Sequence, residues 1–181
     1  MRLSTDETRD EELALETIAV AADAGITVFD TARAYALDGS ELGHNERLLV
    51  RALRSSGADG RARIVTKGGM TRAGGGWIPD GRGRAILADA EASLEALDGL
   101  AIDLYLIHAP DPRTPWRTSV RALNRLVDQG LVRRQPHAAE ADAELRGVKP
   151  SRATQAVEAT SPAQQSVAST VPTPACPGFG R

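Results

Sequence analysis

The chain has 181 residues, of which 41% are hydrophobic, and its formal net charge is -2 near neutral pH. This length and composition suit one ordinary domain, and the near-balanced charge gives no electrostatic case for binding nucleic acid or an anionic membrane. No apolar run approaches the roughly 20 residues that a membrane span needs. The single Cys176 cannot close an intrachain disulfide, so we expect a soluble, cytoplasmic protein.

Helical and strand patterns alternate along most of the chain. Hydrophobic spacing and turn residues predict, in chain order, a helix over 10–24, a strand over 26–29, a helix over 45–55, a strand over 63–66, a helix over 82–97, a strand over 102–107 and a helix over 115–128. The strands begin at about residues 26, 62 and 102, and one strand plus one helix with loops fills each interval. The pattern predicts an α/β fold made of βα units around a parallel sheet.

Each predicted strand is followed directly by a reactive side chain. Asp30, Lys67 and His108 stand at these three positions, and Tyr35 follows Asp30 in the next loop. Because the carboxyl ends of parallel strands in such a repeat converge on one rim, we expect these side chains to share a catalytic site.

Taken singly, each of these residues has an ordinary structural interpretation. Asp30 suits a turn or a helix cap, and Tyr35 suits amphipathic packing at a loop edge. Lys67 suits a solvated loop, and His108 suits a hydrogen-bonded core position. Their joint placement at successive strand ends is what favours catalysis.

Several ordered motifs resemble those of the aldo-keto reductase family. They are GITVFDTARAY over 25–35, NERLLVRAL over 45–53, IVTKGG over 64–69, DLYLIHAPDP over 103–112 and LVDQGLVR over 126–133. The fourth motif resembles the family's D-L-Y-x-x-H-x-P-D segment, and the fifth resembles the helix that runs into the family's fifth strand. The resemblance covers roughly residues 1–134.

The resemblance implies a (β/α)8 TIM barrel that reduces aldehydes and ketones with a nicotinamide cofactor, usually NADP(H). It implies that Tyr35 donates a proton to the carbonyl oxygen, that Lys67 and Asp30 favour loss of that proton, and that His108 orients the carbonyl. Asp30 and Thr31 are further expected to contact the cofactor. The substrate would be a small carbonyl compound.

Other side chains give weaker signals. Trp77 and Trp116 are predicted to lie in loops at the same rim, where they would line a substrate pocket or simply pack. The glycines at 68–69 and 74–76 fit no phosphate-binding pattern and are expected to serve a loop. The three histidines and one cysteine lack ligand-like spacing, so we expect no metal. Glu46 matches a family residue and is expected to be structural.

The chain is expected to divide into a partial barrel over 1–134, with about four βα units, and a low-complexity tail over 135–181. The start, Met1 to Ser4, resembles the end of the family's first strand, and the resemblance stops after Arg134, within the fifth. Ala, Ser, Thr, Pro and Gln dominate the tail, which predicts disorder apart from a short helical turn over 141–145. A frameshift in the coding sequence is one hypothesis for this change.

These features give two functional predictions. The first is an NADP(H)-dependent carbonyl reductase, by resemblance. The second is a truncated, catalytically silent fragment or an interaction module, because the family binds most of its cofactor through positions after the fifth strand. In a partial barrel the exposed strand edges would also favour self-association.

Overall fold

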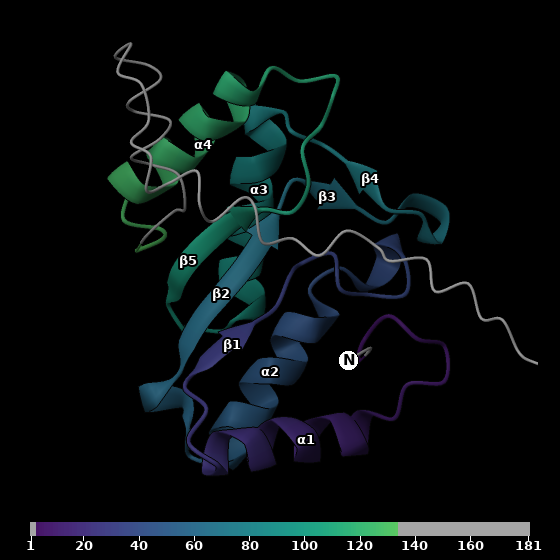
Figure 1. Cartoon of the computed structure of the whole chain (residues 1–181), viewed down its shortest axis with the longest axis vertical. Coiled ribbons are helices and arrows are strands. Elements are labelled where there is room, and N and C mark those ends of the chain that lie inside the picture. Colours follow the sequence, from purple (N-terminus) through teal and green to yellow (C-terminus); the bar gives the residue numbers. More distant parts are fainter. Residues whose placement is uncertain (1–2, 134–181) are drawn as a thin grey trace, which may run out of the picture.

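The computed structural model describes residues 3–133, and these form a parallel sheet with helices (Figure 1). Its three strands are β1 (Val28–Asp30), β2 (Arg63–Gly68) and β5 (Ile102–Ile107), in the order β1-β2-β5. Val132 forms an isolated parallel bridge to Ile102, on the free side of β5. The predictions of a tail over 135–181, of a helical turn within it and of a domain division at 134 lie outside the described residues.

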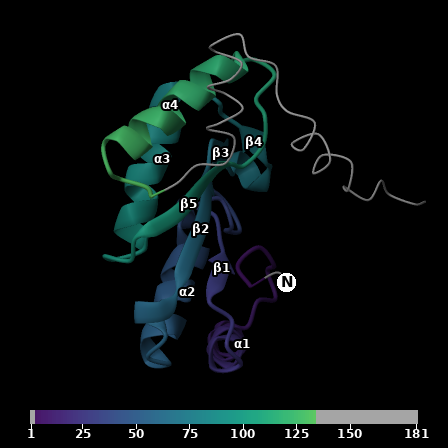
Figure 2. The same cartoon turned by 60° about the vertical axis from the view of Figure 1, so that its left-hand side comes forward.

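Four α-helices within residues 3–133 accompany the sheet, and their arrangement can be followed in Figures 1 and 2. They are α1 (Glu11–Asp23), α2 (His44–Ser55), α3 (Gly83–Ala96) and α4 (Trp116–Asp128). Helix α3 packs on β2 and β5 and lies beside α2, while α1 packs on α2 and α4 packs on α3. Three short 3-10 helices, η1 (Gly39–Glu41), η2 (Asp59–Arg61) and η3 (Ala73–Gly75), lie in the connections. The α/β prediction, with strand followed by helix, is therefore confirmed.

The expected elements are present with small shifts at their ends. Helix α1 begins after Asp10, whose side chain accepts a hydrogen bond from the backbone N–H of Leu13. Strand β1 starts two residues later than predicted, because only Val28–Asp30 pair with β2. Leu3 and Ser4, which resemble a strand end in sequence, lie in a turn.

One supersecondary element was missed. The glycine-rich segment predicted as a loop contains an antiparallel hairpin of β3 (Met70–Thr71) and β4 (Ile78–Pro79). Its turn includes Gly74 and Gly75, both at positive φ, where glycine avoids the strain that a side chain would bring. This hairpin projects beyond the carboxyl end of β2 (Figure 1). It also carries Trp77, whose ring lies near that of His108, the residue that follows β5.

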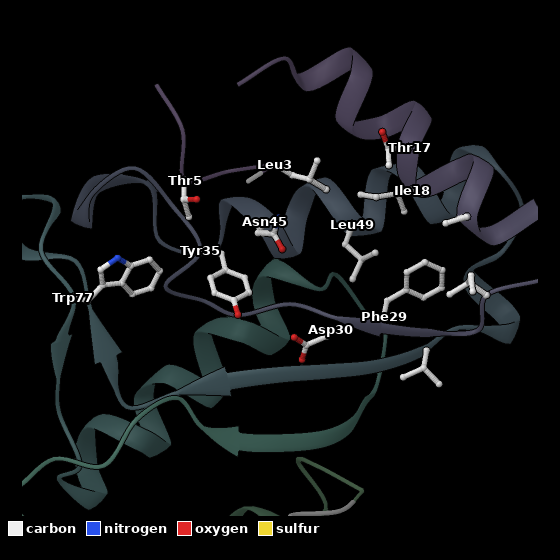
Figure 3. Close-up of a pocket in the computed structure, with 13 residues that line it drawn as sticks. Leu3, Thr5, Thr17, Ile18, Phe29, Asp30, Tyr35, Asn45, Leu49 and Trp77 are labelled. Carbon is white, nitrogen blue, oxygen red and sulfur yellow. The ribbon is translucent and has the colours of Figure 1, made fainter. Parts of the chain in front are cut away.

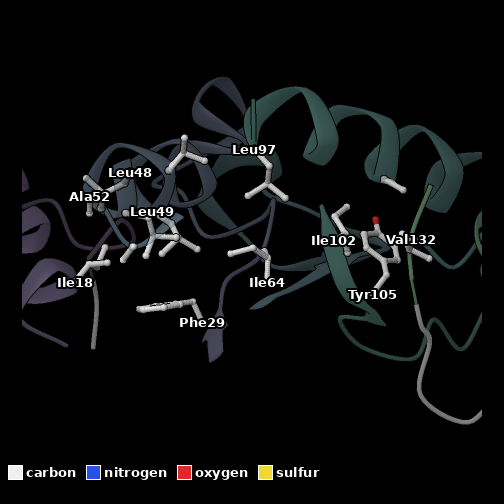
Figure 4. Packing of buried hydrophobic residues seen from close by; sticks show 14 of the residues in the cluster. Ile18, Phe29, Leu48, Leu49, Ala52, Ile64, Leu97, Ile102, Tyr105 and Val132 are labelled. Atoms are coloured by element: carbon white, nitrogen blue, oxygen red, sulfur yellow. The ribbon is translucent and has the colours of Figure 1, made fainter. Parts of the chain in front are cut away.

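The hydrophobic core lies between the helices and one face of the sheet (Figure 4). Ile64, Thr66 and Gly68 are buried on the helix side, while Val65 and Lys67 between them point the other way. Burying one large apolar side chain fully contributes roughly 1.5–3 kcal/mol. The buried side chains include Leu48, Leu53, Ile64, Ile86, Leu97, Ile102, Tyr105 and Leu126. Because side chains alternate along β2, core packing on its helix side determines that Val65 and Lys67 point to the opposite face of the sheet.

No helix within residues 3–133 combines the length and the apolar character that crossing a membrane requires.

Gly68 allows β2 and β5 to pack at the site's edge. A Cβ atom added there would lie 2.0 Å from the hydroxyl oxygen of Tyr105, a fully buried residue. Gly68→Ala should therefore lower the free energy of unfolding by about 1–3 kcal/mol through overpacking, as measured by urea denaturation. Gly60→Ala is the matched control, because its Cβ would meet nothing within 4 Å, and it should change stability by less than about 1 kcal/mol. Equal stability of the two variants would contradict this packing.

Candidate active site

The parallel register staggers the strand ends so that the predicted site residues meet. Asp30 pairs with Val65, and Lys67, two residues further along the same face of β2, pairs with Leu106. His108 stands two residues beyond Leu106, and its backbone N–H continues the ladder to β2. Each strand therefore carries its reactive side chain past the end of its neighbour, onto the face away from α3.

The ammonium group of Lys67 is the centre of this arrangement. Its Nζ atom donates to both carboxylate oxygens of Asp30, at 2.7 and 2.6 Å, and to the carbonyl oxygen of Thr31 at 3.0 Å. The hydroxyl oxygen of Tyr35 lies 3.4 Å from the same nitrogen. The Lys67 side chain is only 14% exposed, whereas that of Asp30 is 56% exposed. A largely enclosed positive charge is thus paired and placed against a phenol.

Two rings, those of His108 and Trp77, lie beside the phenol of Tyr35. The ring centroids of Tyr35 and His108 are 5.3 Å apart at nearly right angles, and Trp77 lies 5.5 Å from His108 and 6.2 Å from Tyr35. Burial, and then the charge of Lys67, lowers the pKa of His108. The imidazole is therefore neutral near pH 7 and can donate only one N–H.

A groove of about 530 Å³ opens beside the phenol (Figure 3). Asp30, Tyr35 and Trp77 stand at its polar end, and apolar side chains of α1, α2 and β1 continue it. They are Ile18, Ala21, Val28, Phe29 and Leu49. The groove therefore combines a phenol and a carboxylate at one end with an apolar wall along its length.

The structure brings together Asp30, Tyr35, Lys67 and His108, with Trp77 beside them. Trp116 differs from its expectation: it is the first residue of α4 rather than a loop residue, and it neither lines the groove nor joins these ring contacts.

Thr31 lies next to Lys67, and its expected contact with a cofactor stays a prediction. It is fully buried, and its hydroxyl donates to the side-chain oxygen of Asn45 at 2.7 Å. Asn45 in turn donates to the hydroxyl of Ser4 at 2.9 Å. Thr31 therefore supports Lys67 through its carbonyl oxygen. No pattern in the sequence singled out Asn45, which is the first residue of the helix motif over 45–53.

A buried polar layer lies behind Lys67, on the helix side of β2. Glu46 is fully buried, and one of its carboxylate oxygens accepts a hydrogen bond from Thr66 at 2.6 Å. Asp89 accepts from the backbone N–H of Gly69 at 2.9 Å and pairs with Arg33 at 3.1 Å. Burial raises the pKa of Glu46 and that of Asp89. Among residues 3–133, no three His, Cys, Asp or Glu side chains cluster closely enough to hold a metal ion.

Comparison with known proteins finds one family. The model of the aldo/keto reductase family matches residues 1–135. The aldo-keto reductase YhdN of Bacillus subtilis (strain 168) is 32% identical over 124 residues, which make up 68% of this chain and 36% of that protein.

Solved structures agree with this match. Aldo-keto reductase AKR11C1 from Bacillus halodurans, in its holo form, superposes with a TM-score of 0.61 at 28% identity, over 74% of this chain and 42% of that one. An aldo/keto reductase from Klebsiella pneumoniae, in complex with NADP and acetate, superposes with a TM-score of 0.55 at 28% identity, over 69% and 38%. The chain spans well under half the length of these relatives.

Glu46 gives a pH-dependent stability test. Its pKa is raised above the ordinary 4.5 on folding, so in the interval between the two values the folded chain binds more protons than the unfolded chain. Its contribution to stability therefore falls as the pH rises through that interval. Relative to wild type, Glu46→Gln should therefore gain stability as the pH is raised above about 4.5, as measured by urea unfolding at a series of pH values.

The exposed Glu12 on α1 supplies the matched control. Glu12→Gln should show no such gain with pH. A Glu46→Gln stability difference that stays constant across the interval would mean that burial does not disfavour the ionised Glu46 carboxylate.

Proposed function

We propose, from the premise that this chain belongs to the aldo/keto reductase family, that it carries the proton-transfer site of an NADP(H)-dependent reductase of aldehydes and ketones. One observation carries the proposal: the hydroxyl oxygen of Tyr35 lies 3.4 Å from the ammonium of Lys67, which Asp30 holds with two short hydrogen bonds. The pairing suits a phenol that must give up a proton during the reaction.

Tyr35 is the proton donor in this proposal. Reduction of a carbonyl builds negative charge on its oxygen, so a donor must stand in contact with that oxygen. Once the phenol has given its proton, the nearby Lys67 ammonium stabilises the phenolate that remains. Asp30 holds Lys67 in place, because both of its carboxylate oxygens accept hydrogen bonds from the ammonium.

His108 orients the carbonyl group. Its ring packs edge-on against Tyr35, and its lowered pKa keeps it neutral near pH 7. A neutral imidazole offers an N–H that directs the carbonyl oxygen towards the phenol without adding a second positive charge. The proton therefore comes from Tyr35 rather than from His108.

The described residues suit the reactive end of the cofactor. The exposed Asp30 carboxylate has acceptor capacity beyond its bonds to Lys67, and it would accept the amide N–H of a nicotinamide in the groove. When bound, NADP(H) supplies the hydride. The NADP complex of the similar Klebsiella pneumoniae protein supports this choice of cofactor. We assign no residue within 3–133 to the cofactor's phosphates.

A second candidate function is a catalytically silent interaction module. Val28 and Ile26, on and beside the outer strand β1, are 59% and 50% exposed, which suits contact with another protein surface. The two candidates differ in cofactor binding, since an interaction module has no need of it.

Titration of the purified chain with NADPH, followed by cofactor fluorescence, tests the proposal. We expect saturable binding and reduction of an aldehyde such as benzaldehyde. Tyr35→Phe should lower the reduction rate by about 100-fold or more while cofactor affinity changes by less than about twofold, because only the proton donor is lost.

Tyr105→Phe is the matched control, since Tyr105 is fully buried on the opposite face of the sheet, and its rate should stay near that of wild type. Absence of saturable NADPH binding would leave the interaction module as the better account. Undiminished turnover in Tyr35→Phe would remove Tyr35 from its role.

A further inference from the structure

Arg72, at the end of β3, is a buried arginine whose contacts are not explained by the proton-transfer site. It is only 6% exposed, although buried arginines are rare unless their charge is paired. Within residues 3–133, no carboxylate lies within ion-pair distance of its guanidinium. Something other than an ordinary ion pair holds this charge.

The guanidinium has two kinds of partner. Its Nε and Nη2 atoms donate to the backbone carbonyl oxygens of Ala36 and Leu37, at 3.2 and 2.8 Å. Its carbon atom lies 4.0 Å from the centroid of the Trp77 ring, within the range of a cation–π contact. Ala36 directly follows Tyr35, so one side chain connects the segment of the proton donor to the indole on the hairpin.

This contact fixes the position of the indole. Trp77 lies on an exposed hairpin between η3 and β4, in a segment that contains three successive glycines, so the backbone alone restrains it weakly. Arg72 stacks on the ring. The ring centroids of Tyr35 and His108 lie 6.2 and 5.5 Å from the centroid of the indole. The residue remains 46% exposed, and it lines the groove beside Tyr35 (Figure 3).

We propose that Arg72 is a positioning residue that holds Trp77 as a fixed wall of the groove, and that this wall selects carbonyl compounds bearing a flat apolar group. The choice of substrate rests on the proposed function, whereas the positioning of Trp77 does not. A flat apolar group binds more tightly when it stacks on a ring that is already fixed, because binding then loses no conformational entropy of the indole. Lysine cannot replace Arg72 fully, since an ammonium lacks the planar fork that stacks and donates at once.

Trp77 reports its own position by fluorescence. The chain has two tryptophans, so Trp116→Phe leaves Trp77 as the sole emitter. In that background Arg72→Leu should raise the acrylamide quenching constant of Trp77 about twofold, because the cation–π contact and both carbonyl bonds are lost. Arg121→Leu, on the exposed face of α4, is the matched control and should leave quenching unchanged.

Circular dichroism establishes that each variant is folded. If Arg72→Leu does not fold, Arg72→Lys tests the positioning role in its place. In that variant the acrylamide quenching constant of Trp77 should rise by a smaller factor, because a cation remains. Unchanged quenching in the folded variant would overturn the positioning role.

Kinetics with NADPH test the selection of substrate. In Arg72→Leu, the KM for benzaldehyde should rise about tenfold, while the KM for propanal and both kcat values change less than about twofold. Equal KM changes for the two aldehydes would overturn the selection of flat groups. An unsubstituted chain without turnover would sink the proposed function and, with it, the selection; the quenching result would still decide whether Arg72 positions Trp77.

Discussion

The ion pair of Lys67 and Asp30 is the interaction on which the site depends. Lys67 is almost enclosed, and removing an ammonium from water costs several kcal/mol unless it is paired and hydrogen-bonded. Asp30 supplies the charge, and the Thr31 carbonyl and the Tyr35 hydroxyl take the remaining contacts. Because all these partners come from β1 and the loop after it, the pair also ties the end of β1 to β2. The interaction that holds the strand ends together therefore also places an ammonium beside the phenol of Tyr35.

The alternation of β2 connects this site to the core. Lys67 points to the open face, and its neighbours Thr66 and Gly68 point to the helices. Thr66 is bonded to the buried Glu46, and Gly68 leaves room for Tyr105. A shift of β2 by one residue would exchange the two faces, which would bury the ammonium and expose the core. Packing on the helix side therefore determines where the reactive side chain stands.

Sequence patterns predicted the parts of this arrangement that depend on long periodic segments. Helices α1 to α4 and strands β2 and β5 lie close to their predicted bounds, and the strand-end residues meet because parallel strands share an edge. The hairpin of β3 and β4 was not predicted, because strands of two residues are too short to show an alternating hydrophobic pattern. The contact of Arg72 with Trp77 depends on that hairpin, so this contact was not predicted either. The helix predicted over 115–128 already contained Trp116, but a helical pattern does not show which distant groove a residue at the helix start reaches, so its place outside the groove was not predicted.

Because the strand register places these side chains, we expect the site to be assembled before any ligand binds. The most direct measurement is nuclear magnetic resonance of the ligand-free chain, with cross-relaxation recorded between the ring protons of Tyr35 and His108, whose centroids are 5.3 Å apart. The chain has only two tyrosines and three histidines, so Tyr105→Phe identifies the Tyr35 signals. We predict cross-peaks between the two rings without cofactor or substrate. Their absence in a folded, assigned sample would contradict a preassembled site.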